Sequence, residues 1–159
     1  MIRGVFHVNI NCSNFERSLE FYKTLGFRVA VDLSEGGSMD LDHGLGLKKG
    51  RGRAALLLIG DDPRATRIDL IEWKSPSSRG KPYAKLNHLG IARVALRTRD
   101  LRATYEELKS KGVKFISEPV VLHTPVGDSL FACFYDPDGT ILELIEFVPQ
   151  TTQPPAEHY

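Results

Sequence analysis

The hydrophobic and polar positions along the chain form one pattern that occurs twice. In residues 4–29 an alternating apolar stretch is followed by a polar turn, a segment with helical periodicity, a glycine and another strand-like stretch. Residues 90–115 repeat this order and align with the first copy without a gap. Alternation with a period of two predicts a strand, whereas apolar residues at i, i+4 and i+7 predict an amphipathic helix. The sequence therefore predicts two related halves.

Each copy contains start and stop signals for its helix. Asn14 and Asp100 are good N-cap residues, and Gly26 and Gly112 stand where the helices are expected to end. The apolar stripes that would face the sheets are Phe15, Leu19 and Tyr22 in the first copy and Leu101, Tyr105 and Leu108 in the second. The strand before the first helix is expected to turn Phe6, Val8 and Ile10 to one side and His7 to the other.

A second pair of similar segments closes each half. Residues 68–73 (IDLIEW) match residues 142–147 (LELIEF) position by position, and both are strand-like. Further strands are expected at 27–33, 54–60, 119–122 and 129–135, with a loop at 36–52. Each half then runs strand, helix, strand, strand, strand, which is an α+β fold. We expect one domain, residues 1–148, made of modules 4–74 and 90–148 with a linker at 75–89 and a flexible tail at 149–159.

Composition and charge argue against several classes of protein. The net charge of +1 argues against a protein that binds nucleic acid or a membrane surface through bulk charge. The basic run 48–53 is expected to be solvated surface. Two cysteines, Cys12 and Cys133, are too few for a disulfide scaffold and are expected to be small buried residues. No apolar run approaches the roughly 20 residues of a membrane span, and no signal peptide is evident, so we expect a cytoplasmic protein.

Two segments connect the chain with a known family. The first is the strand with His7 followed by SLEFYKTLGF, and the second is the closing DPDGTILEL. With these segments in duplicated context, the chain resembles the vicinal oxygen chelate superfamily. That superfamily includes glyoxalase I, methylmalonyl-CoA epimerase, extradiol dioxygenases, and the fosfomycin and bleomycin resistance proteins. The resemblance implies curved mixed sheets around an open cleft that takes a small molecule, often in a homodimer.

The resemblance also implies a metal site. Each half of such a protein places one ligand on its first strand and one on its last, which here are His7, Asp69, Arg93 and Glu143. A half-buried carboxylate needs a cation or hydrogen bonds, because burying it unpaired costs several kcal/mol. Imidazole with carboxylates suits Fe, Mn, Ni, Co or Zn.

Arg93 departs from this pattern, because the metal-dependent enzymes usually carry His, Gln or Glu there. Arginine is always protonated and has no lone pair for a metal. In one interpretation His7, Asp69 and Glu143 hold the metal, and Arg93 grips an acidic group of the substrate. In the other, the guanidinium takes the place of the cation beside Asp69 and Glu143, and no metal binds. Electrostatics favours the second, since a fixed cation repels a divalent metal in a cleft.

Two main functions stay open at this point. One is a metal-dependent lyase or isomerase that acts next to a carbonyl, with Glu143 as ligand and proton carrier. The alternative is a metal-free binding protein of the bleomycin-resistance type, with Trp73 and Phe147 lining the cleft. His123 is a further candidate substrate contact. An extradiol dioxygenase is a third option, but it usually needs two histidines and a carboxylate, and Arg93 replaces one histidine.

Overall fold

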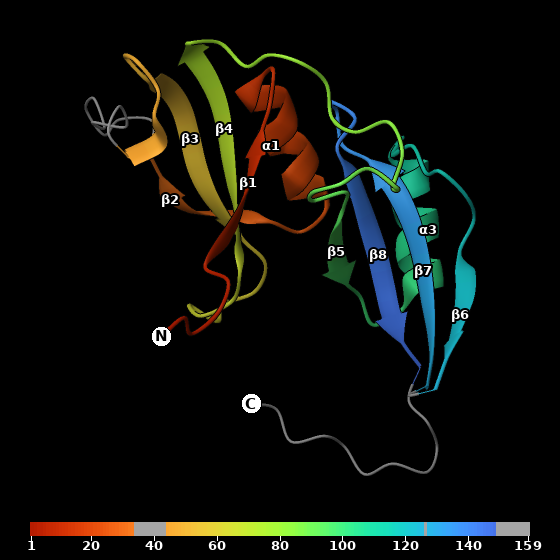
Figure 1. Ribbon diagram of the computed structural model, residues 1–159. Coiled ribbons are helices and arrows are strands. Elements are labelled where there is room, and N and C mark those ends of the chain that lie inside the picture. Colours follow the sequence, from red (N-terminus) through yellow and green to blue (C-terminus); the bar gives the residue numbers. More distant parts are fainter. Residues whose placement is uncertain (34–43, 126, 149–159) are drawn as a thin grey trace. The chain divides into compact units, whose positions relative to one another are not determined.

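The computed structural model describes residues 1–33, 44–125 and 127–148 (Figure 1). The chain divides into two compact units, Met1–Lys81 and Pro82–Tyr159, which we call the first and second modules. The expected linker, residues 75–89, spans this division, and the expected tail, residues 149–159, lies outside the described residues.

The first module consists of one helix and one four-stranded sheet. Its elements are β1 (His7–Asn11), α1 (Phe15–Thr24), β2 (Arg28–Asp32), β3 (Arg51–Leu58) and β4 (Arg67–Ser75). The strands lie in the order β1-β4-β3-β2. Strand β1 is parallel to β4, and the other pairs are antiparallel, so the sheet is mixed.

The second module repeats this arrangement. Its elements are β5 (Val94–Arg97), α3 (Leu101–Ser110), β6 (Val120–Thr124), β7 (Gly127–Tyr135) and β8 (Ile141–Phe147). The strand order is β5-β8-β7-β6, again with one parallel pair, β5 with β8. The predicted α+β fold with two βαβββ modules is confirmed.

The expected helix signals act at the ends of both helices. The side chain of Asn14 accepts a hydrogen bond from the backbone N–H of Arg17 at 3.0 Å. The side chain of Asp100 accepts one from Ala103 at 2.9 Å. Gly26 follows the end of α1 with a φ of 96°, a left-handed conformation that suits glycine. Local sequence therefore determines where these helices begin and end.

Strand β3 begins earlier than the sequence predicts. Arg51 and Gly52, expected in the loop 36–52, pair with β4 instead. A Cβ on Gly52 would lie 2.8 Å from the carbonyl oxygen of Glu72, so glycine permits a close approach of two backbones. A glycine in a polar stretch suggests a loop, and only the neighbouring strand reveals its role. Residues 34–43 of the expected loop lie outside the described residues.

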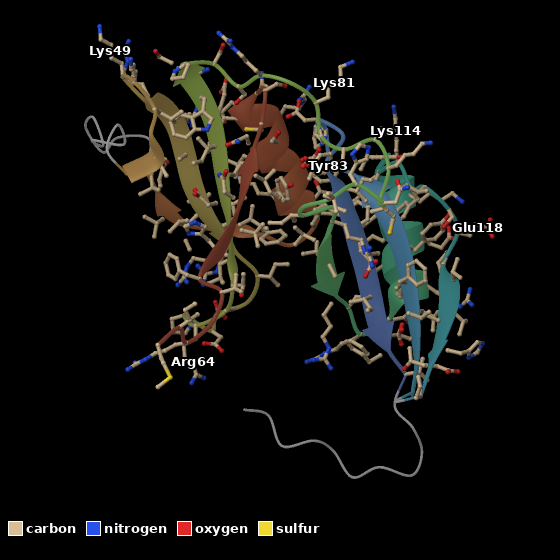
Figure 2. The ribbon with its side chains drawn as sticks, viewed as in Figure 1. Lys49, Arg64, Lys81, Tyr83, Lys114 and Glu118 are labelled. Atoms are coloured by element: carbon tan, nitrogen blue, oxygen red, sulfur yellow. The ribbon has the colours of Figure 1, made fainter. Side chains whose placement is uncertain are left out.

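The basic run 48–53 is only partly solvated surface. Lys49 and Arg64 lie near opposite ends of the first module's sheet (Figure 2), and both are exposed. Arg53, by contrast, pairs with Glu16 of α1, and its guanidinium lies 4.5 Å from the centroid of the Phe15 ring. Arg53 therefore helps to fix α1 on the sheet.

Each helix rests on one face of its sheet through apolar side chains. The buried residues of α1 include Phe15, Leu19 and Tyr22, and those of α3 are Leu101, Tyr105 and Leu108, as the periodicity predicts. None of the helices in the described part of the chain has the length and apolar character needed to cross a membrane.

A glutamate in the last strand of each sheet binds the start of the helix. Glu72 Oε2 accepts a hydrogen bond from the backbone N–H of Phe15 at 3.1 Å, and Glu146 Oε2 accepts one from Leu101 at 2.7 Å. A carboxylate is favoured there by the unpaired N–H groups and the positive end of the helix dipole. These glutamates therefore fasten both helices to their sheets.

We expect Glu146→Gln to lower the free energy of unfolding by about 1 kcal/mol, because the neutral amide is a weaker acceptor at a helix N-terminus. Chemical denaturation measures this change. Glu106→Gln, on the exposed surface of α3, is the matched control and should change stability much less. Equal effects of the two substitutions would contradict the role given to Glu146.

Candidate functional site

The face of the first sheet opposite α1 carries His7, Asn11, Asp69 and Trp73, which we call the first site face. The Nε1–H of Trp73 donates to Asn11 Oδ1 at 2.9 Å, so β1 and β4 present these side chains to the same side. Glu72, between Asp69 and Trp73 in β4, points to α1 instead, as strand alternation requires.

Asp69 and His7 lie together on the first site face. His7 Nε2 is 3.9 Å from Asp69 Oδ2, and the Asp69 side chain is only 14% exposed. Asp69 Oδ1 is buried and has no hydrogen-bond partner among the described residues. Burial raises the pKa of Asp69, and the nearby His7 partly offsets this increase. The carboxylate is thus incompletely satisfied by the protein.

The corresponding face of the second sheet, opposite α3, carries Arg93, Cys133, Glu143 and Phe147, which we call the second site face. Arg93 Nε donates to Glu143 Oε2 at 2.5 Å. The Glu143 side chain is 7% exposed and that of Arg93 is 46% exposed, so a nearly buried carboxylate is neutralised by a partly exposed guanidinium. This is a charge-assisted hydrogen bond in a poorly solvated place.

Cys133 also contacts Glu143, directly across the β7–β8 ladder. Its Sγ lies 3.7 Å from Glu143 Oε2. Burial, followed by the negative charge of Glu143, raises the pKa of the Cys133 thiol to about 11. The thiol therefore keeps its proton at neutral pH and donates a hydrogen bond to the carboxylate.

Cys133 is the site residue that the sequence interpretation missed, since it was expected only to be buried. Cys133 is buried, as expected, and it also lies on the second site face. A signal was available in the turn at residues 136–139. This turn pairs Tyr135 with Ile141, and counting back along both strands places Cys133 opposite Glu143.

The two aromatic candidates lie on the same faces as the carboxylates. Trp73 is held by Asn11, as described above. Phe147 is exposed, and the guanidinium carbon of Arg97 lies 5.5 Å from the centroid of its ring. Each site face therefore offers an aromatic surface near the end of its last strand.

His123 does not join Glu143. It lies within β6, and its Nδ1 is 2.9 Å from Asp128 Oδ1. Asp128 is five positions before Cys133 in β7, an odd number that places the two residues on opposite faces of the strand. The structure thus places His123 on the face that bears α3, paired with an aspartate.

Comparison with known proteins identifies the family. A sequence profile of the Glyoxalase/Bleomycin resistance protein/Dioxygenase superfamily matches residues 4–144. The chain belongs to this superfamily. A relative, the uncharacterized protein YwkD of Bacillus subtilis, is 30% identical over 150 residues, which cover 92% of this chain and 98% of YwkD.

Solved structures of superfamily proteins share the fold. A glyoxalase family protein from Bacillus cereus matches with a TM-score of 0.79 and 18% identity, covering 94% of this chain and 97% of that one. The trypanothione-dependent glyoxalase I of Leishmania major matches with a TM-score of 0.62 and 19% identity, covering 91% and 87%. At these identities the likeness concerns the fold.

Each module contains one pair of residues at the positions that the resemblance gives to metal ligands. In the first, Asp69 has an oxygen without a partner beside a histidine, which suits a cation. In the second, the carboxylate of Glu143 already binds a cation, the guanidinium of Arg93. Across the described ranges, no group of three or more His, Cys, Asp or Glu side chains is arranged to hold a metal ion. Because arginine has no lone pair for a metal and Arg93 already occupies Glu143, the chemistry of this pair does not fit a metal ligand role.

We expect Asp69→Asn to stabilise the protein by about 1 kcal/mol at pH 7, because it removes a buried carboxylate without full hydrogen bonding. The pKa of Asp69 is raised in the folded state, so the folded state binds this proton more readily than the unfolded state. The stabilisation should therefore shrink as the pH falls from 7 towards 4. Urea denaturation of wild type and Asp69→Asn between pH 4 and pH 7 measures this difference in the free energy of unfolding. A difference that does not change with pH would contradict the assignment of the effect to the Asp69 carboxyl.

Proposed function

We propose that this protein binds a small organic molecule directly through the side chains of its site faces, without a divalent metal on Glu143. The observation that carries the proposal is the hydrogen bond from Arg93 Nε to Glu143 Oε2. This function is of the bleomycin-resistance type within the superfamily.

Electrostatics supports the proposal. A guanidinium and a divalent cation on the same carboxylate would repel each other strongly where solvent screens them little. If a metal displaced Arg93 from Glu143, it would also break a charge-assisted hydrogen bond to a carboxylate that is 7% exposed. The protein therefore supplies its own cation at this position.

The remaining side chains suit direct binding. On the second site face, Phe147 provides an aromatic contact and Arg93 provides a charged group for an acidic part of a ligand. Trp73 provides an aromatic contact on the first site face. Arginine favours such partners because its planar fork matches a carboxylate. His123, on the α3 side with Asp128, has no part in this proposal.

A metal-dependent lyase or isomerase is the second candidate function. The partnerless Oδ1 of Asp69 beside His7 favours it. These two residues could hold a divalent metal such as Fe, Mn, Ni, Co or Zn, which would polarise substrate oxygens. A third ligand is still needed, since catalytic sites commonly use three, and Glu143 is engaged by Arg93. An extradiol dioxygenase has less support, because Arg93 stands where its second histidine is expected.

A cytoplasmic location and a homodimer stay predictions. The location rests on the sequence and the homodimer on the resemblance, so neither enters the argument for direct ligand binding.

Metal binding tests the proposal. We expect the wild-type protein, purified without chelator and titrated with Ni²⁺ or Zn²⁺, to hold much less than one metal per chain after desalting. Arg93→His removes the fixed cation and restores a residue type usual in the metal-dependent enzymes. This variant should retain metal at least about tenfold more tightly than wild type, which corresponds to roughly 1.4 kcal/mol.

Arg102→His, on the exposed surface of α3, is the matched control and should behave as wild type. Elemental analysis measures the stoichiometry, and circular dichroism confirms that each variant is folded. One tightly held metal per wild-type chain, lost in Glu143→Gln, would overturn the proposal in favour of the enzyme.

A further inference from the structure

The hydrogen bonds of Glu143 use only one of its two carboxylate oxygens. The Nε–H of Arg93 and the thiol of Cys133 both point to Oε2, at 2.5 Å and 3.7 Å. No residue in the described ranges donates to Oε1. Glu143 is thus held in place through one oxygen, and the other can still accept a hydrogen bond.

Only one nitrogen of the Arg93 guanidinium forms a hydrogen bond within the described residues. Its Nε is bonded to Glu143, whereas its two terminal nitrogens have no partner in the part of the chain that the structure describes. The Arg93 side chain is 46% exposed. These two nitrogens are parallel donors of the kind that bind a carboxylate through both of its oxygens.

The pair therefore presents one acceptor beside two donors. We infer that the Arg93–Glu143 pair recognises a 2-hydroxy acid, the ligand class that this arrangement fits and a deepening of the function proposed above, on which it rests. The carboxylate of the ligand binds the terminal nitrogens of Arg93, and its neighbouring hydroxyl donates to Glu143 Oε1.

Local charge favours a hydroxyl over an ammonium group as the donor. The charge of Glu143 is already compensated by Arg93, so an ammonium group would gain little from the carboxylate and would lie near the guanidinium. A hydroxyl provides the hydrogen bond without that repulsion. The positions fixed by the structure thus select both groups of the ligand.

The same face offers an apolar surface for the rest of the ligand. Ile145 follows Glu143 by two positions in β8, about 7 Å along the strand, and it is paired in register with Phe131 of β7. Both side chains are half-buried and share the face of Glu143. A 2-hydroxy acid with a phenyl group next to the hydroxyl-bearing carbon is therefore a suitable probe.

Three simple probes separate the contributions of the two groups. Mandelate carries the carboxylate, the hydroxyl and a phenyl ring. Phenylacetate lacks only the hydroxyl, and methyl mandelate lacks the carboxylate charge. We expect wild-type protein, followed by two-dimensional NMR during titration, to bind one mandelate enantiomer at least about tenfold more tightly than either of the other probes.

The side-chain Nε–H signal of Arg93 should shift on addition of mandelate. Arg93→Gln, which removes the partner of the ligand carboxylate, should abolish the preference for mandelate over methyl mandelate. Glu143→Gln, which weakens the acceptor for the ligand hydroxyl, should reduce the preference for mandelate over phenylacetate. Arg102→Gln is the control for the loss of one positive charge in the second module and should leave all three affinities unchanged. Similar affinities of the three probes for wild type, or no binding of mandelate, would overturn the inference, and neither result depends on whether a variant folds.

Failure of the 2-hydroxy acid inference is distinguishable from failure of the proposed function. A metal bound through Glu143 in wild type overturns the proposed function by elemental analysis, before any probe is added. If the protein is free of metal and binds mandelate and phenylacetate with similar affinity, the proposal of direct binding still stands. Only the inference that the ligand is a 2-hydroxy acid is then overturned.

Discussion

The site of this protein depends on one constraint, which is that a carboxylate on a buried strand must be compensated. Glu143 lies in β8 among apolar neighbours and is 7% exposed. Leaving it ionised without a partner would cost several kcal/mol. Arg93, just before β5, supplies the positive charge, and Cys133 adds a weaker hydrogen bond from β7. The three groups together decide which atoms stay available to a ligand.

The two modules differ in how far they compensate the carboxylate at this position. In the first, the residue equivalent to Arg93 is His7, which lies 3.9 Å from Asp69 and does not satisfy Oδ1. A histidine can be neutral and can bind a metal, whereas an arginine can do neither. The duplicated fold thus carries one position suited to a cation and one that already contains its own. Superfamily membership accounts for the fold, and this difference between equivalent residues is the basis of the proposed direct binding.

Most of the fold could be predicted from the sequence, because its signals are local. The N-caps and the order of elements follow from short patterns, and the duplication supports each of them. The predicted start of β3 at residue 54 was wrong, because the close contact of Gly52 with β4 is not a local signal. At the site, the positions of Arg93 and Glu143 follow from the repeat, but their bond required coordinates. Cys133 and the face of His123 depend on strand register, which a single segment does not reveal.

The most direct test of the account is a double-mutant cycle on Arg93 and Glu143. Free energies of unfolding of wild type, Arg93→Gln, Glu143→Gln and the double variant give the coupling between the two side chains. The account predicts a favourable coupling of roughly 1 to 3 kcal/mol, typical of hydrogen bonds to charged groups. A coupling near zero would mean that Arg93 does not hold Glu143, and it would contradict both the metal-free site and the ligand class derived from it.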